Sequence, residues 1–435
     1  MNNLPEEKHD HQTLHFPDGF LWGSGTSSFQ VEGNIQNSEW WNWEMKYQKE
    51  EFRSGIAADH YNRYEEDFKI AEDLKHNAHR LSLEWSRIEP HEREFDTAEI
   101  EHYRKVLQSL KSKNIKVMLT LHHFSNPQWF AQKGGWASRH AAKRFERFVK
   151  RIIPEYKDLV DYWITINEPT TYTSYAYYTR EFPPSERNIW KLWWAYWNMA
   201  QAHKKAYKAI HKAVPTAQVG MTTAAQSFKH FHWHSLLEAF VVWAGDLTSN
   251  HSFYILTGKK YHDFIGLNYY LNRYISINGR WVIPNLLDIS PAKKDASDLG
   301  WEIYPEGMFD MLLDFNSYHK PIIITENGIA STNDDRRSRF LISYLKEIYH
   351  AISIGVDVRG YFYWSFMDNM ELHRGFTPRF GLIEIDYETQ RRRVRDSARV
   401  YAEIIKRNGI PHDLLAFIGH TIQAKKILRE GIHED

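Results

Sequence analysis

Short apolar runs recur eight times along the chain, each followed by a longer stretch of mixed character. The runs cover residues 20–23, 78–83, 115–121, 162–166, 217–223, 264–268, 322–325 and 359–365. Most are rich in β-branched and aromatic residues, and turn-forming residues close several of them. A continuous apolar run of this length predicts a strand that is buried on both faces.

The stretches between these runs show the periodicity of amphipathic helices. Two of them show it most clearly: 100–113, with Ile100, Tyr103, Val106, Leu107 and Leu110 on one stripe, and 340–354, with Leu341, Tyr344, Leu345 and Ile348. Eight alternating strand–helix units in one chain predict an α/β fold, a single (β/α)8 TIM barrel.

The chain carries no Pro/Gly/Ser-rich linker, no block of like charges and no internal repeat. With 435 residues, of which 42% are hydrophobic, it is long enough to bury one large core. We therefore expect residues 1–435 to form one domain, with a core at about 15–409. Residues 410–435 form an amphipathic tail, for which packing on the barrel is favoured over a partner site.

Two of the predicted strands end in a glutamate. The fourth run leads into Asn167-Glu168-Pro169, and the seventh leads into Thr325-Glu326-Asn327-Gly328. A carboxylate at the end of a buried strand is costly unless something uses or pairs it. Because the chemistry of a (β/α)8 barrel lies at the carboxyl ends of its strands, we expect Glu168 and Glu326 to face one cavity.

Two carboxylates that share a cavity are the minimum equipment for cleaving a glycosidic bond. One must be charged and the other protonated, so their pKa values must be pushed apart, and Arg80 at the end of the second strand is the natural cation. Asn167 could bind a substrate hydroxyl, and Tyr269 and Tyr270 could donate to the nucleophilic carboxylate. The alternative is that each glutamate is a structural ion-pair partner.

Composition narrows the possible partners. The 55 Lys and Arg residues balance 55 Asp and Glu residues, so no overall field favours nucleic acid or an anionic membrane. The chain has no cysteine, which excludes disulfides and thiolate metal sites. The N-terminal residues lack a signal-peptide pattern, and no apolar run approaches the roughly 18 residues of a membrane span. We expect a soluble, cytoplasmic protein that binds neither nucleic acid nor membrane; its oligomeric state is left open.

Three other patterns suggest weaker alternatives. Residues 391–395 are basic, which we interpret as a solvated face at the start of the following helix rather than a nucleic-acid patch. The pair His122-His123 could suggest a metal, but adjacent strand residues point to opposite faces. The alternating histidines in 230–234 would align on a strand, yet this stretch reads as a helix or a loop, so a packed or surface cluster is favoured over a metal site.

A set of motifs, in one order from about His15 to Gly409, resembles glycoside hydrolase family 1, the retaining β-glycosidases. The motifs are Phe20-Leu21-Trp22-Gly23, Phe29-Gln30-Val31-Glu32-Gly33, Arg80 to Ile88 (RLSLEWSRI), Leu121-His122-His123-Phe124, Ile166-Asn167-Glu168-Pro169, Asp263 to Tyr270 (DFIGLNYY), Gly300 to Gly307 (GWEIYPEG), Ile324 to Gly328 (ITENG), Trp364 to Glu371 (WSFMDNME) and Arg379-Phe380-Gly381-Leu382.

The resemblance implies a role for each matching position. Glu326 matches the nucleophile and Glu168 the acid/base. Residues that match those binding the hydroxyls of the non-reducing sugar are Gln30, His123, Asn167 and Glu371, with Trp364 as the aromatic platform below the ring and Trp301 lining the leaving-group site. Arg80, Asn268 and Tyr270 match the group that orients and ionises the nucleophile. The activity implied is an exo-β-glycosidase of the β-glucosidase type that takes a small carbohydrate substrate and needs no cofactor or metal.

The chain departs from the family pattern at Leu372, where the family usually has tryptophan. That change removes one indole N–H donor aimed at the sugar, so glucose recognition could shift to another glycone. A 6-phospho-β-glycosidase is an alternative, because His373 and Arg374 could attract a phosphate, but the acid at Glu371 would repel it. A barrel that binds sugars without cleaving them is a further alternative, and the sequence does not separate hydrolysis from transglycosylation.

Overall fold

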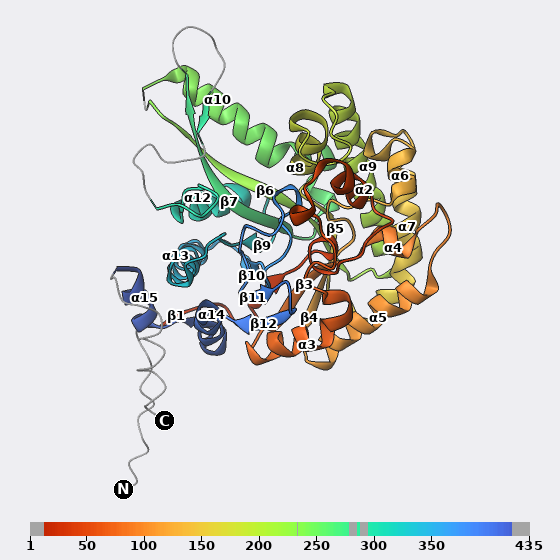
Figure 1. Cartoon of the computed structure of the whole chain (residues 1–435). Coiled ribbons are helices and arrows are strands. Elements are labelled where there is room, and N and C mark those ends of the chain that lie inside the picture. Colours follow the sequence, from red (N-terminus) through yellow and green to blue (C-terminus); the bar gives the residue numbers. More distant parts are fainter. Residues whose placement is uncertain (1–12, 233, 278–284, 288–294, 420–435) are drawn as a thin grey trace.

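Eight parallel strands close into a barrel at the centre of the molecule (Figure 1). This computed structural model describes residues 13–232, 234–277, 285–287 and 295–419. The barrel strands are β2 (Leu21–Gly25), β3 (Ala78–Ser82), β4 (Lys116–Thr120), β5 (Tyr162–Asn167), β6 (Gln218–His230), β7 (Ile265–Ser276), β9 (Ile322–Asn327) and β10 (Val358–Trp364). Each strand pairs in parallel with the next, and β10 pairs with β2 to close the ring. The predicted (β/α)8 fold is confirmed.

Long helices surround the barrel, and short helices lie in the loops that connect strands to helices. One long helix follows each barrel strand except β6, which two shorter helices follow: α3 (His60–Asp73), α5 (Thr97–Ser112), α7 (Ala141–Tyr156), α9 (Ile189–Ala213), α10 (Leu236–Asp246) with α11 (Ser252–Thr257), α12 (Glu306–Asn316), α13 (Asp334–Ser353) and α14 (Asp396–Arg407). Short helices in the loops are α1 (Ser28–Val31), α2 (Glu39–Tyr47), α4 (Trp85–Ile88), α6 (Gln128–Gln132) and α8 (Pro169–Ser174). The periodicity of residues 100–113 and 340–354 thus predicted α5 and α13 correctly.

Most of the core falls into two clusters, which follow from the alternation of side chains along each strand. Ile322 and Ile324 of β9 belong to the large cluster between the strands and the outer helices. Ile323 belongs to a small cluster with Leu21, Ala78, Met118, Ile164, Phe264 and Phe362. Six of these seven residues belong to barrel strands, and Phe264 directly precedes β7, so the small cluster fills the inside of the barrel and forms the floor below the site.

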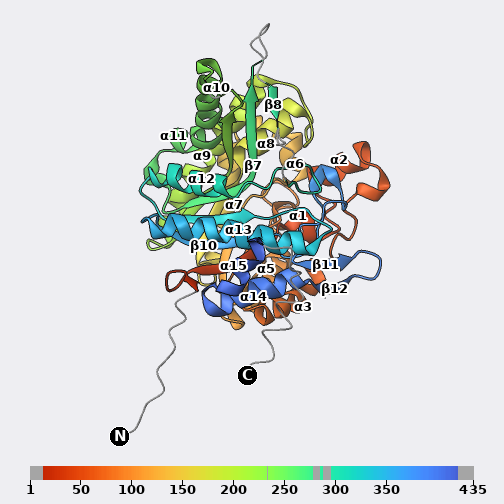
Figure 2. The ribbon, with the colours of Figure 1, turned by 90° about the vertical axis from the view of Figure 1, so that its left-hand side faces the viewer.

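Strands β6 and β7 are much longer than the runs 217–223 and 264–268 predicted. They remain paired with one another as far as His230 and Ile275, beyond the point where the other strands end. A short strand, β8 (Asn285–Leu287), adds to the free edge of β7, and α10 packs on this two-stranded extension. Figure 2 shows the extension and α10 standing above the barrel. The sequence did not predict it, because the extension is held by long-range pairing of partly polar residues.

The basic run 391–395 does not start a helix, so that prediction was wrong. Residues Arg391–Val394 form β12, which pairs antiparallel with β11 (Ile383–Asp386), and the helix begins only at Asp396. The side chain of Arg392 is buried against the carboxylate of Asp67 at 2.9 Å. The run is therefore half of a hairpin in which charged side chains are paired.

The two ends of the described chain lie side by side, where β1 (Leu14–His15) pairs with β13 (Gly409–Ile410). The start of the predicted tail forms α15 (His412–Gly419), which buries Leu414 and Phe417 against the core, so the tail packs on the barrel in this part. The rest of the tail, 420–435, and residues 1–12 lie outside the described residues. Among the described residues, no helix is long and apolar enough to cross a membrane.

Candidate active site

Irregular pairing at the ends of β5 and β9 directs the polar residues into the barrel. The register of β9 against β7 shifts between Ile324 and Glu326, and that of β5 against β6 shifts between Ile164 and Asn167. Strict alternation would place Glu326 on the side of Ile324, which packs against the helices. A bulge inserts one residue and reverses the direction of the side chains after it. The bulges therefore explain why polar residues follow these apolar strands.

Glu326 is paired with a buried cation and a phenol. Arg80, which is fully buried, donates from Nη1 to Glu326 Oε1 and to the backbone oxygen of Thr325 at 3.1 Å. The hydroxyl of Tyr270 donates to the other carboxylate oxygen at 2.8 Å. Burial, followed by the charge on Glu326, holds the pKa of Tyr270 well above its ordinary value, so the phenol stays a donor. Both carboxylate oxygens of Glu326 are thus engaged by donors.

Glu168 lies in a different electrostatic environment. It follows β5 directly and precedes Pro169, the first residue of α8, with a backbone φ of 42° that non-glycine residues rarely adopt. Asn268 Nδ2 donates to Glu168 Oε1 at 2.6 Å. Burial raises the pKa of Glu168 to about 7, and the nearby charge of Glu326 adds to the rise. Near neutral pH this carboxyl can hold a proton, whereas Glu326 faces Arg80.

The side chain of Asn167 links the partners of the two carboxylates, because it contacts both Arg80, which binds Glu326, and Asn268, which binds Glu168. Its Oδ1 accepts from Arg80 Nη2 and from Thr222 Oγ1, both at 2.6 Å, and from Asn268 Nδ2 at 3.3 Å. Its Nδ2 lies 3.3 Å from His123 Nε2. The sequence did not single out Thr222, which lies inside a predicted strand without any polar pattern around it.

The contacts of Asn268 and Tyr269, two neighbouring residues of β7, differ from those that the sequence predicted. Asn268 was expected to act on the nucleophile, but its amide contacts Glu168, and its Oδ1 accepts from Thr325 Oγ1 at 2.6 Å. Of the two tyrosines that could have donated to Glu326, only Tyr270 does so, because Tyr269 points outward and its hydroxyl donates to the backbone oxygen of Tyr304 at 3.2 Å. Adjacent strand residues point to opposite faces, which accounts for the difference.

Gln30 and Glu371 come together from opposite ends of the chain. Gln30 Nε2 donates to Asn369 Oδ1 at 3.0 Å, to the backbone oxygen of Met370 at 2.9 Å and to Glu371 Oε2 at 3.4 Å. Burial, together with the charge of Glu326, raises the pKa of Glu371 to about 8. The pair presents amide and carboxyl groups suited to reading adjacent hydroxyls. Asn369 was not predicted as a site residue, although it lies in the motif that contains Glu371.

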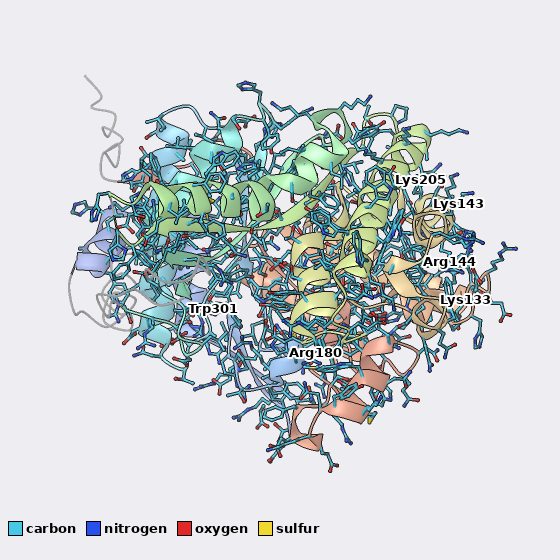
Figure 3. The ribbon with its side chains drawn as sticks, turned by 90° about the horizontal axis from the view of Figure 1, so that it is seen from above. Lys133, Lys143, Arg144, Arg180, Lys205 and Trp301 are labelled. Atoms are coloured by element: carbon cyan, nitrogen blue, oxygen red, sulfur yellow. The ribbon has the colours of Figure 1, made fainter. Side chains whose placement is uncertain are left out.

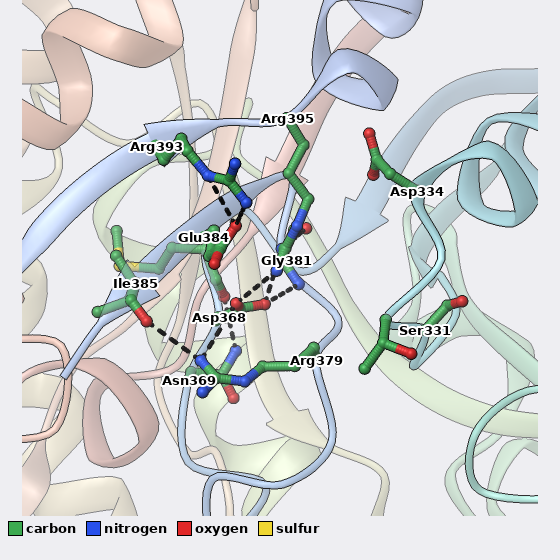
Figure 4. A network of polar contacts seen from close by, with 12 residues as sticks. Ser331, Asp334, Asp368, Asn369, Arg379, Gly381, Glu384, Ile385, Arg393 and Arg395 are labelled. Atoms are coloured by element: carbon green, nitrogen blue, oxygen red, sulfur yellow. Dashed lines mark hydrogen bonds and ion pairs between the residues drawn. The ribbon is translucent and has the colours of Figure 1, made fainter. Parts of the chain in front are cut away.

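A buried ionic network holds the loop that carries these groups (Figure 4). Asp368 is fully buried and accepts from Arg395 at 2.8 and 2.9 Å and from Arg379 at 3.3 Å. The backbone N–H of Gly381 donates to the same carboxylate at 2.9 Å. Because Asp368 lies next to Asn369 in the chain, this network fixes the position of the loop that brings Glu371 to the cavity.

Aromatic rings form the walls of the site. Trp364, at the end of β10, is 4% exposed, and the ring of His123 stacks parallel to it at 5.7 Å. Burial keeps the pKa of His123 well below its ordinary value, so the imidazole is neutral. Trp301 is half-buried, and its ring centroid lies 6.0 Å from that of Tyr270.

The basic side chains Lys133, Lys143, Arg144 and Lys205 lie away from this site, and Figure 3 shows them on the opposite side of the molecule from Trp301. Lys133 and Arg144 bind Glu92, and Lys205 binds Glu146.

These residues line one cavity of about 650 Å³. Its lining includes both glutamates and most of the predicted site residues: Gln30, His123, Glu168, Tyr270, Trp301, Glu326, Trp364 and Glu371. Leu372, His373 and Arg374 also line it. Arg80, Asn167 and Asn268 are completely buried behind the wall and act on the lining residues rather than facing the cavity.

The other histidine patterns have local partners. The ring of His122 lies 2.9 Å from Asn126 Oδ1, away from His123, which faces Trp364. His232, in the loop after β6, binds the carboxylate of Glu238 at 2.7 Å. A separate cluster, Asp246, His251 and Asp314, has a geometry that could suit a metal, and no pattern in the sequence indicated it. His251 already bridges the two acids, at 3.5 and 2.6 Å.

Comparison with known proteins agrees with the geometry. The sequence model of glycosyl hydrolase family 1 matches residues 12–235 and 246–410. A 1,4-beta-D-glucan glucohydrolase of Thermotoga neapolitana is 29% identical over 91% of this chain and 99% of its own, and a beta-galactosidase of Sulfolobus acidocaldarius is 31% identical over 92% and 97%. The structure of a beta-glycosidase from Pyrococcus horikoshii, 34% identical, matches with a TM-score of 0.88 over 94% of this chain and 99% of that one. The chain therefore belongs to glycosyl hydrolase family 1 and is a retaining, β-glucosidase-type hydrolase of O-glycosyl bonds.

Proposed function

We propose that Glu326 is the nucleophile and Glu168 the acid/base of this hydrolase. The observation that supports this assignment is the asymmetry of the two carboxyl groups. Glu326 is held by the cation of Arg80 and the phenol of Tyr270, whereas burial and the charge of Glu326 raise the pKa of Glu168 to about 7. One group is therefore suited to attack and the other to donate a proton.

The reaction then runs in two steps. A carboxylate oxygen of Glu326 attacks the anomeric carbon, the bond from that carbon to the leaving oxygen breaks, and Glu168 gives that oxygen its proton. Once Glu326 is esterified, its charge no longer raises the pKa of Glu168. The Glu168 carboxylate then takes a proton from water, the water oxygen bonds to the anomeric carbon, and the ester bond breaks. The sugar leaves with its configuration retained.

A separate group of residues holds the terminal non-reducing sugar, on the side of the carboxylates opposite to the leaving group. Gln30 and Glu371 are placed to bind a pair of its hydroxyls, and His123 and Asn167 contact one another beside them. The face of Trp364 is suited to the apolar face of a pyranose. Trp301 lines the part of the cavity that would receive the leaving group.

Chemical rescue tests the two roles separately. Glu326→Gln should lose turnover of an aryl β-glucoside by several orders of magnitude, because no covalent intermediate can form. Glu168→Ala should keep the first step for a leaving group that needs no proton, and added azide should restore turnover and give a β-glycosyl azide. Glu302→Gln provides a matched control, since this buried glutamate binds Asn272 at 2.8 Å outside the reacting pair. Rescue of Glu326→Gln to the same β-product would reverse the assignment.

A further inference from the structure

The cavity continues past the two carboxylates into an apolar chamber. Five apolar side chains of this chamber come from the β6–β7 extension and from α10: Phe228, Val241, Ala244, Leu271 and Ile275. Phe228 lies six positions beyond Thr222, which contacts Asn167, and at about 3.3 Å per residue this places it roughly 20 Å farther along β6. The chamber therefore lies well away from the groups that bind the sugar.

The size of the cavity also exceeds what one sugar needs. A volume of about 650 Å³ is in the range that holds a drug-sized ligand, and a single pyranose would fill only part of it. The polar residues of the chamber include Gln226 and Arg273, and Arg273 Nε donates to Gln226 Oε1 at 2.5 Å. The remaining volume thus has walls that suit a chain of carbon atoms better than a second sugar.

The helix that closes the chamber is outside the common family pattern. The family model matches up to residue 235 and resumes at 246, so the residues between them, which make up nearly all of α10, are not matched. These residues contain one charged side chain, Glu238, which is buried and binds His232 and the backbone N–H of Ile277. On the inner side, Gly245 lies against Phe228, where an added Cβ would be 3.4 Å from the ring. The wall that α10 contributes to the chamber therefore lies outside the part of the chain that the family model matches.

The part of the same helix that faces solvent is also apolar. Leu236 is 87% exposed, and Leu237, Phe240 and Trp243 are exposed beside it. The first turns of α9 add four exposed tryptophans, Trp190, Trp193, Trp194 and Trp197. Figure 1 shows both helices in the upper half of the molecule, with α10 at the left and α9 at the right. We call these eight side chains the apolar face.

Two charged residues of α9 and α10 that lie among these side chains have acidic or basic partners. Lys191, between the tryptophans of α9, binds Glu186 at 2.6 Å, and Glu238 is the buried acid already described. An uncharged face complements an uncharged surface, and tryptophan is the residue most typical of the boundary between lipid and water. The face adjoins the chamber, because Leu237 and Phe240 each lie one helical turn before a chamber residue of α10, Val241 and Ala244 respectively.

We propose that this enzyme acts on amphiphilic β-glycosides held in a neutral lipid surface. The sugar lies between Gln30, Glu371 and Trp364, and the apolar chain of the aglycone lies in the chamber below α10. The apolar face contacts the lipid surface, so that the substrate passes from the lipid into the chamber without exposing its chain to water. This substrate class rests on the proposed function, because it requires hydrolysis at Glu168 and Glu326.

A series of n-alkyl β-glucosides tests the chamber. Between ethyl and octyl, below the concentration at which micelles form, kcat/KM should rise roughly fourfold for each buried methylene. Ala244→Phe places a ring in the chamber and should remove most of this dependence while the ethyl glycoside is still cleaved. Ala239→Phe is the matched control, since Ala239 is exposed on the same helix, and it should keep the dependence. A flat series in the unchanged enzyme would overturn the proposal, whereas no cleavage of any member or of an aryl β-glucoside would overturn the proposed function itself.

Flotation with phosphatidylcholine vesicles tests the apolar face. The enzyme should float with the vesicles, and Trp193→Gln combined with Trp243→Gln should reduce the bound fraction at least tenfold while hydrolysis of the ethyl glycoside is unchanged. Tyr47→Gln combined with Ile354→Gln changes two side chains that are equally exposed elsewhere and should float as before. If the enzyme does not float but sediments as a dimer that the tryptophan variant dissociates, a second copy covers this face and the lipid contact is refuted.

Discussion

The hydrogen bond from Asn268 to Glu168 gives a quantitative prediction for the pH dependence of the enzyme. Asn268 Nδ2 lies 2.6 Å from Glu168 Oε1, and this bond stabilises the charged form of the carboxyl, so it lowers a pKa that burial raises. As the acid must be protonated to work, kcat/KM should fall as the pH rises through the pKa of about 7. Asn268→Ala removes the bond and should move that fall to higher pH.

The size of the shift follows from the bond. A hydrogen bond to a charged group contributes about 1.5–3 kcal/mol, and one pKa unit corresponds to about 1.4 kcal/mol. Because water can enter the space left by the amide, the lower end applies, and the basic limb should move up by about one unit. The assay is kcat/KM for an aryl β-glucoside between pH 5 and 9.5, with the stability of the protein checked at each pH.

Thr325→Val supplies the control for this experiment. Thr325 Oγ1 donates to Asn268 Oδ1 at 2.6 Å, so the change disturbs Asn268 without removing its bond to Glu168. The basic limb of Thr325→Val should stay in place. If Asn268→Ala leaves the limb unmoved, the limb belongs to another group, such as Glu371 with its pKa of about 8, and the assignment of Glu168 as the acid fails.

Three further predictions concern stability and recognition. Asp368→Asn removes the charge that Arg379 and Arg395 share, so urea unfolding should show a loss of about 3 kcal/mol or more, whereas the exposed pair changed by Asp357→Asn should lose less than about 1 kcal/mol. The pKa of His251 is raised to about 9 by Asp246 and Asp314, above its ordinary 6.5, so its ion pairs stabilise the fold below pH 6.5 and this contribution, up to about 3 kcal/mol, is lost as the pH rises through 9. His251→Gln should lack that loss between pH 6 and 9.5, and an equal slope in both proteins would contradict the reasoning. Leu372→Trp, which restores an indole donor at the wall of the cavity, should lower KM for a β-glucoside roughly tenfold relative to Leu372→Phe, and equal KM values would show that this position does not contact the sugar.

The sequence predicted the barrel because its signal is local. Runs such as 322–325 are apolar enough to be strands only if both faces are buried, and the intervening stripes could only be helices. The strand-end glutamates and Glu371 gather at one end of the barrel, as their positions after the predicted strands indicated. Most of the candidate residues therefore line or support one cavity.

The features that the sequence did not predict depend on contacts between distant residues. The bulges that direct Asn167 and Glu326 inward arise from pairing with neighbouring strands. The contact of Asn268 with Glu168 was not predicted, because a position in the sequence does not show which of two close groups an amide faces. The basic run 391–395 was misread because its partners, Asp67 and Asp368, come from other parts of the chain.

Arg80 has a consequence for how little the site must rearrange during turnover. Besides Glu326, its guanidinium contacts three uncharged oxygens on three strands: Thr120 Oγ1 at 3.3 Å, Asn167 Oδ1 at 2.6 Å and the backbone oxygen of Thr325 at 3.1 Å. When Glu326 becomes an ester and loses its charge, these three contacts remain. The guanidinium therefore keeps its position, so the dipoles around the anomeric carbon keep the same orientation in both half-reactions. The reorganisation energy of each step is reduced accordingly, because a frame that was assembled during folding does not have to be rebuilt in each cycle.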